Sequence, residues 1–94
     1  MLLFSLLFAG GVVAQTKVPK RAQRQLDLAV EKFMSRDVQG AFAAVEDALE
    51  TFPAFADAWM LKSQLHEGQS QWAAAADALN RAVQSNPALA QKWL

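Results

Sequence analysis

Hydrophobic positions recur along most of this chain at the three- and four-residue spacing of an α-helix. Leu26, Val30 and Phe33 show this spacing first, and Ala41, Val45 and similar positions continue it. Apolar residues at this period line one face of a helix. The pattern therefore predicts four amphipathic helices, over residues 21–35, 38–51, 54–67 and 71–85.

The residues between these stretches are typical of helix boundaries. The run 35–37 reads as a turn, and Asp37 is expected to cap the next helix by accepting from its free amide groups. Pro53 and Pro87 end the second and fourth helices, because proline disfavours helix at the residue before it. Gly68 is expected to end the third helix in a left-handed conformation.

The chain also repeats itself at an interval of 34 residues. Its three prolines, Pro19, Pro53 and Pro87, lie at this interval. A shift of 34 residues also aligns several alanines and large apolar residues: Ala22 with Ala56 and Ala90, Ala41 with Ala75, Ala48 with Ala82, Val45 with Leu79, Val38 with Trp72, and Trp59 with Trp93. An internal period of this length is typical of helical-repeat proteins.

This layout resembles the tetratricopeptide repeat (TPR) family over residues 19–94. The second unit carries the family's pattern at Trp59, Ala75, Leu79, Ala82 and Pro87; the first carries it at Ala41, Val45, Ala48 and Pro53. The chain departs from the pattern where Gln25 replaces the aromatic residue of the first unit. It departs again where Lys62, Ser63 and His66 replace a Leu, a small residue and a Tyr of the second.

The resemblance implies an all-α fold of antiparallel helix pairs stacked as an α-solenoid, with about two full repeats and the start of a third. Alanines would let the helices approach closely, and large residues, including Trp59 and Trp72, would pack between them. One pair cannot bury its apolar face alone, so pairs are expected to stack. The predicted organisation is a signal peptide (1–14), a leader (15–20), two repeats (21–53 and 54–87) and a truncated third repeat (88–94).

Residues 1–14 are apolar and uncharged, like the hydrophobic region of a signal peptide, with cleavage expected before Gln15. As a helix they would span about 21 Å, which is too short for a stable transmembrane span. No Lys or Arg precedes them, so the true N-terminus could lie upstream. The alternative is a buried helix of the fold. We expect export to the periplasm, the outer membrane or the extracellular space.

Charge and composition exclude several kinds of function. The nine basic and nine acidic residues balance, which argues against nucleic-acid binding. Without cysteine the chain has no disulfide, thiolate metal site or lipoprotein anchor. His66 has no second His or Cys with which to form a metal or catalytic site, and it is expected to pack. Trp59, Trp72 and Trp93 are also expected to pack. We therefore predict no catalytic residue, no metal site and no cofactor.

By analogy with the family, a protein or peptide partner would bind to a groove formed by the first helix of each unit. The positions that match are Gln23, Leu26, Val30, Phe33, Met34, Asp57, Met60, Gln64 and Glu67. Methionine suits adaptable packing against a partner. One subclass of the family binds C-terminal carboxylates through Lys and Asn, but Leu26 and Val30 occupy those places here.

The sequence thus favours an exported protein–protein interaction scaffold. One alternative is the N-terminal part of a larger envelope protein, since a signal followed by loose repeats resembles bacterial outer-membrane proteins that continue into an OmpA-type peptidoglycan-binding domain. Another is self-association through the Trp93 end, and a third is a set of accessory repeats attached to an enzyme. With two full units, folding of residues 15–94 alone is expected to be marginal.

Overall fold

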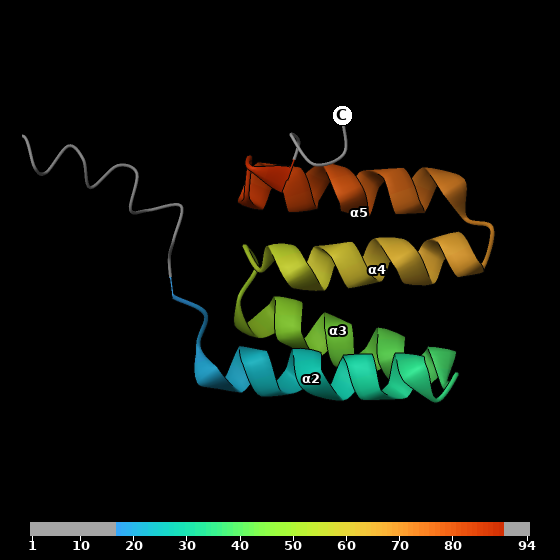
Figure 1. The fold of residues 1–94 in the computed structure, drawn as a ribbon, viewed down its shortest axis with the longest axis horizontal. Helices are drawn as coiled ribbons and strands as arrows, with labels where there is room; N and C mark the ends of the chain where they lie inside the picture. Colours follow the sequence, from blue (N-terminus) through green and yellow to red (C-terminus); the bar gives the residue numbers. More distant parts are fainter. Residues whose placement is uncertain (1–16, 90–94) are drawn as a thin grey trace, which may run out of the picture.

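The computed structural model describes residues 17–89, in which four helices follow one another along the chain (Figure 1). They are α2 (Lys20–Met34), α3 (Val38–Thr51), α4 (Ala56–Gly68) and α5 (Trp72–Ser85). The four helices predicted from the apolar spacing are confirmed, with every boundary within two residues of its predicted position. The predicted signal peptide and residues 90–94 of the predicted third repeat lie outside the described residues.

The helices pack as two antiparallel pairs. The chain reverses direction at each connection, so that α2 packs against α3 and α4 against α5 (Figure 1). Helix α3 joins the pairs by packing against α4, and α2 touches α4 as well. The predicted all-α fold of stacked antiparallel helix pairs is therefore confirmed for the described part of the chain, which contains no strand.

The turn between α2 and α3 is built as predicted. The Asp37 side chain accepts a hydrogen bond from the backbone N–H of Gly40 at 2.9 Å, so it caps α3. Arg36, in the same turn, has a left-handed backbone with φ of 64°. The backbone N–H of Asp37 then donates to the carbonyl of Lys32 at 2.8 Å, which gives a free carbonyl group at the end of α2 a hydrogen-bond partner.

The prediction for the end of α4 is wrong in one respect. Gly68 remains within the helix, and the left-handed residue is Ser70, with φ of 58°. The N–H of Gln71 bonds to the carbonyl of His66 at 2.9 Å and closes the end of α4, as the N–H of Asp37 bonds to the carbonyl of Lys32 one unit earlier. The turn geometry therefore repeats at 34 residues without glycine.

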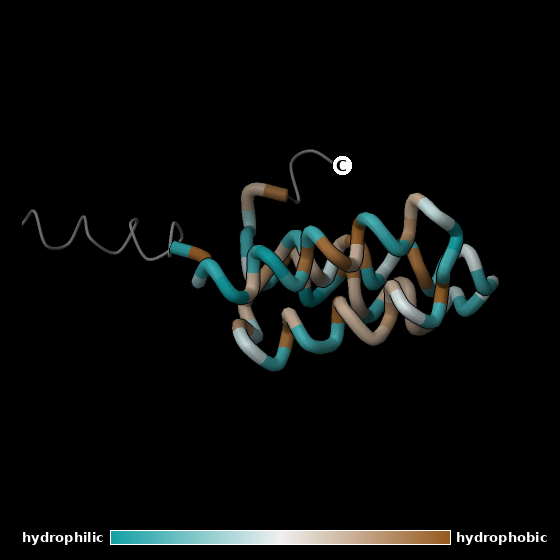
Figure 2. Tube along the Cα trace, turned by 90° about the horizontal axis from the view of Figure 1, so that it is seen from below, coloured by the Kyte–Doolittle hydropathy of each residue, from teal (hydrophilic) through white to brown (hydrophobic). Residues whose placement is uncertain are grey.

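The main core lies among α2, α3 and α4. Figure 2 shows hydrophobic and hydrophilic positions alternating in short runs along the helices, as one-sided burial requires. Val45 of α3 is fully buried at its centre. Around Val45 lie Ala22, Leu26, Ala29, Ala41, Ala44, Ala48, Leu49, Phe55, Ala58, Leu61 and Leu65. The predicted role of Ala41 and Ala48 at close helix contacts agrees with their complete burial.

Helix α5 is attached differently from the other three. Its buried residues are all alanines, namely Ala75, Ala78 and Ala82. The hydroxyl of Ser63 on α4 donates to the carbonyl of Ala75 at 3.0 Å, and this is a buried contact. Alanine buries little apolar area. The fully buried contacts of the fourth helix are therefore made by small residues that allow close approach, together with the hydrogen bond from Ser63.

The two tryptophans of the described chain, Trp59 and Trp72, differ in how far they are buried. Trp59 is half-buried against the core, as predicted, and its indole N–H donates to the carbonyl of Pro53 at 2.8 Å. Trp72 was also predicted to pack, and this is wrong, because 64% of it is exposed. It begins α5, and among residues 17–89 this helix packs only against α4. No further helix covers its outer side there.

Candidate partner-binding face

The α2 half of the predicted groove is apolar near the end of the helix. Val30, Phe33 and Met34 follow the i, i+3, i+4 spacing that places them on one face, and they are 41%, 38% and 75% exposed. Leu26 is only 7% exposed and belongs to the core, so it offers little surface to a partner. Gln23 is exposed and donates from Nε2 to Asp27 Oδ1 at 2.9 Å.

The α4 half is polar and acidic. Asp57, Gln64 and Glu67 are exposed, and Met60 is half-buried between them. These four residues are three or four positions apart, so they share one face of α4. Helices α2 and α4 touch, so the two halves lie on neighbouring helices. The structure thus offers an apolar end on α2 beside an acidic strip on α4.

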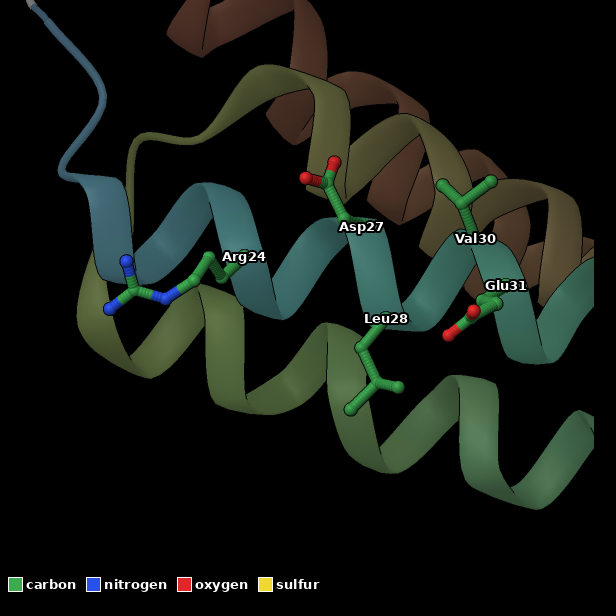
Figure 3. A pocket seen from close by; sticks show the side chains of 5 residues that line it. All are labelled: Arg24, Asp27, Leu28, Val30 and Glu31. Atoms are coloured by element: carbon green, nitrogen blue, oxygen red, sulfur yellow. The ribbon is translucent and has the colours of Figure 1, made fainter.

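A shallow hollow on α2 overlaps the predicted groove at one residue only. It is lined by Arg24, Asp27, Leu28, Val30 and Glu31 (Figure 3). Four of the five were not predicted as site residues. Figure 3 shows Asp27 and Val30 pointing one way from the helix and Leu28 the other, toward α3. Leu28 is 45% exposed despite its apolar side chain.

Sequence reasoning missed a cluster of charges around Trp59. Lys62 Nζ lies 5.1 Å and the Arg81 guanidinium carbon 5.2 Å from the centre of the indole ring. Both distances permit cation–π attraction. Lys62 Nζ also lies 2.7 Å from Glu46 Oε2 on α3. The spacing of Trp59 and Lys62 on one helix was visible in the sequence, but the contributions of α3 and α5 depend on the fold.

His66 packs, as predicted. Its ring centre lies 5.0 Å from that of Phe42 on α3, and Nδ1 lies 2.7 Å from Oε1 of Gln71. Within residues 17–89 no group of three or more His, Cys, Asp and Glu residues is placed to hold a metal ion. None of the helices in this part of the chain is long and apolar enough to cross a membrane.

The described surfaces of the neighbouring helices α2 and α4 therefore carry both apolar and charged groups. Comparisons with protein-family models, with curated proteins and with solved structures find no significant match to this chain.

Proposed function

We propose that this chain is a protein-binding scaffold of the TPR type, which takes a peptide or a helix of a partner protein on the face formed by α2 and α4. The stacked antiparallel helix pairs and the 34-residue period support the proposal. The resemblance of residues 1–14 to a signal peptide supports action outside the cytoplasm. We assign no catalytic role to the chain.

The exposed apolar trio on α2 is the observation that carries the proposal. Val30, Phe33 and Met34 are large, adjacent and accessible at the end of the helix. Water contact with such a group is unfavourable, and apolar patches bordered by polar residues are typical of interaction sites. Glu67, near the end of α4, adds negative charge at the end of the stack where the trio lies, whereas Asp57 lies at the start of α4. A matching partner segment would carry two or three apolar residues followed by Lys or Arg.

The wider context is a separate proposal. The resemblance to the front of an OmpA-type envelope protein would place this scaffold between the outer membrane and the peptidoglycan. Reading the coding DNA beyond Leu94 tests this idea. An in-frame peptidoglycan-binding domain would support it, and an in-frame catalytic domain would favour accessory repeats of an enzyme instead.

Binding of short peptides tests the scaffold function. The 94-residue chain would be used to select from a phage library of random twelve-residue peptides, and the selected peptides would be measured by fluorescence anisotropy. We expect Phe33→Gln and Met34→Gln each to weaken binding about tenfold, because each removes an apolar group that the bound peptide would cover and that contributes about 1.4 kcal/mol to binding. Selected peptides should be enriched in apolar and basic residues.

Leu28→Gln is the matched control, because Leu28 is an exposed apolar residue of the same helix that points toward α3. It should leave affinity within about twofold. If Leu28→Gln weakened binding as much as Phe33→Gln, or if a chain carrying both the Phe33 and Met34 changes still bound normally, the α2–α4 face would not be the site.

A further inference from the structure

Four basic residues gather where α2 begins. Lys17 precedes the helix, Lys20 and Arg21 are its first two residues, and Arg24 lies one turn further on. All four side chains are exposed, and residues 17–26 include no acidic residue. We call these four residues the cationic patch. Positive charge is therefore concentrated at one end of the helix.

The helix brings three of these charges to one side of its first turns. Arg24 lies three residues after Arg21 and four after Lys20, so the three side chains are neighbours on the helix surface. Side chains of a helix lean toward its start. Figure 3 shows the Arg24 guanidinium reaching back in that direction. Its charge is therefore added to those at the start of α2.

The patch residues have no acidic partner in the described chain. The cations that form ion pairs there, at 3.6, 2.7 and 3.3 Å from a carboxylate oxygen, are Lys32, Lys62 and Arg81. None of the four patch residues forms such a pair within residues 17–89. Their charges are therefore available to a surface outside the molecule.

Three acidic residues lie near the patch without pairing with it. Asp27, the next acidic residue on α2, accepts a hydrogen bond from Gln23 at 2.9 Å instead. Asp47 and Glu50 belong to the last turns of α3, which ends beside the start of α2 (Figure 1). Because none of the three is within ion-pairing distance of a patch residue, the field on the exposed side of the patch remains positive.

Two of the patch charges oppose the stability of the helix that carries them. Free amide groups give the start of a helix a partial positive charge, so Lys and Arg are unfavourable there. Lys20 and Arg21 occupy the first turn of α2, which contains no acidic residue and has no side-chain cap at Pro19. The stability of the fold therefore does not account for these residues, whereas contact with an anionic surface would.

We propose that the cationic patch docks on an anionic lipid bilayer and holds the helical stack against it by the start of α2. The complementary charges are the phosphate groups of anionic lipids, which attract clusters of Lys and Arg. A bilayer is favoured over an acidic protein because the patch closely follows residues 1–14, an uncharged apolar sequence of the kind directed to membranes. The expected cleavage before Gln15 keeps the patch on the mature chain.

This surface is separate from the proposed peptide-binding face. The start of α2 lies about 21 Å from Met34 at its end, which is about twice the screening length in 0.1 M salt. A peptide on the apolar trio would therefore leave the patch accessible. The inference does not depend on the proposed peptide partner, and either can fail without the other.

Vesicle binding tests the patch directly. The 94-residue chain would be mixed with vesicles of phosphatidylcholine alone or with phosphatidylglycerol added, and bound protein would be measured by sedimentation. Binding to neutral vesicles measures what apolar contact contributes, and the extra affinity for anionic vesicles measures the patch. Each basic residue near an anionic surface contributes about fivefold in affinity. We expect at least about a thirtyfold preference for anionic vesicles in 0.1 M salt, which 1 M salt should abolish by reducing the screening length to about 3 Å.

Arg21→Gln and Arg36→Gln form a matched pair of variants. Both arginines are exposed and make no ion pair among residues 17–89, but Arg21 lies at the start of α2 and Arg36 beyond its end. Arg21→Gln should weaken binding to anionic vesicles about fivefold, and Arg36→Gln less than about twofold. Equal losses would show attraction to the charge of the whole chain and would overturn docking through the patch.

A double variant separates docking from a structural role. Lys20→Gln with Arg21→Gln should reduce the preference for anionic vesicles about twentyfold. Its Tm should be unchanged or up to about 3 °C higher, because two cations leave the positive end of the helix. An unchanged preference would refute the proposal. A Tm lowered by several degrees would show that these cations support the fold, which would remove the reason for assigning them to a bilayer.

Competition with polyglutamate distinguishes a bilayer from an acidic protein. A bilayer presents a dense, flat array of phosphates, whereas a peptide presents a single line of carboxylates. We expect polyglutamate at an equal concentration of negative charge to leave the chain on anionic vesicles. Displacement by polyglutamate would assign the patch to an acidic protein instead, and an equal affinity for neutral and anionic vesicles would refute the patch as a docking surface.

Discussion

Truncation of two repeat-related residues provides a direct measure of how unequally the two units are buried. Val45 of α3 is fully buried, whereas Leu79, its counterpart on α5, is half-buried. We predict that Val45→Ala destabilises the chain more than Leu79→Ala does, although the valine substitution removes fewer atoms. In most proteins the order is the reverse, because leucine loses more apolar area.

The magnitudes follow from burial. Val45→Ala removes two methyl groups from a site without solvent contact, at about 0.8 kcal/mol each, and the cavity left among α2, α3 and α4 raises the total to about 2–3 kcal/mol. Leu79→Ala removes one more carbon, but part of that area already contacts water. Solvent can also enter the space, so its cost is about 1 kcal/mol.

Urea denaturation followed by far-ultraviolet circular dichroism measures both values. The difference between the two free energies of unfolding should be at least about 1 kcal/mol, with unchanged m-values. A domain this small has only a few kcal/mol of stability, so the Val45→Ala midpoint should fall substantially. If Leu79→Ala costs as much as Val45→Ala, then Leu79 is covered in solution, and the argument from unequal burial fails.

Two further predictions concern helix ends and glycines, both measured by the same urea titration. Asp37→Ala should cost about 1 kcal/mol, because the N–H of Gly40 loses its side-chain acceptor, and an unchanged midpoint would show that the cap contributes nothing. Gly68→Ala should stabilise the folded chain by about 0.5 kcal/mol, because Gly68 is helical and an added Cβ meets no neighbouring atom. Gly40→Ala should bring no gain in stability, because its Cβ would collide with the Asp37 carboxylate. Equal effects of the two alanines would contradict this difference.

Much of the fold could be predicted from the sequence because the residues that determine each helix and its ends lie close together in the sequence. Apolar spacing determined the four helices, and Pro53 stopped α3 where expected. The cap at Asp37 needs only a carboxylate in front of a helix, so it was also predictable. These features depend on residues within a few positions of one another.

The errors came from features that depend on neighbours in space. Trp72 was expected to pack because it is apolar and repeat-related to Val38, but burial also requires a second surface, and α5 contacts only α4 in the described chain. Gly68 was expected to be left-handed from its residue type alone, whereas it is the last residue of α4 and the left-handed residue is Ser70, two positions later. The charges around Trp59 come from three helices, so no local pattern could reveal them.

The accessibility of the residues in the predicted groove could be predicted only in part. Val30, Phe33 and Met34 were placed on the binding face, and they are exposed. Leu26 was placed there too, but it turns into the core, since a position on the border between two faces can belong to either. Leu28, exposed on the other side of α2, was not identified, because apolar residues in a helix are ordinarily assigned to its buried face.

The two left-handed turns have a consequence for how this sequence can change over evolutionary time. Arg36 and Ser70 adopt nearly the same φ, 64° and 58°, and the residues that follow them, Asp37 and Gln71, make equivalent backbone hydrogen bonds. The shared geometry survives complete divergence of the residues that form it. The ends of the packed helices, rather than the turn residues, therefore dictate the path of the chain there. One backbone path is therefore compatible with different residues at these turns, and substitutions at Arg36 or Ser70 are expected to leave the path of the chain unchanged.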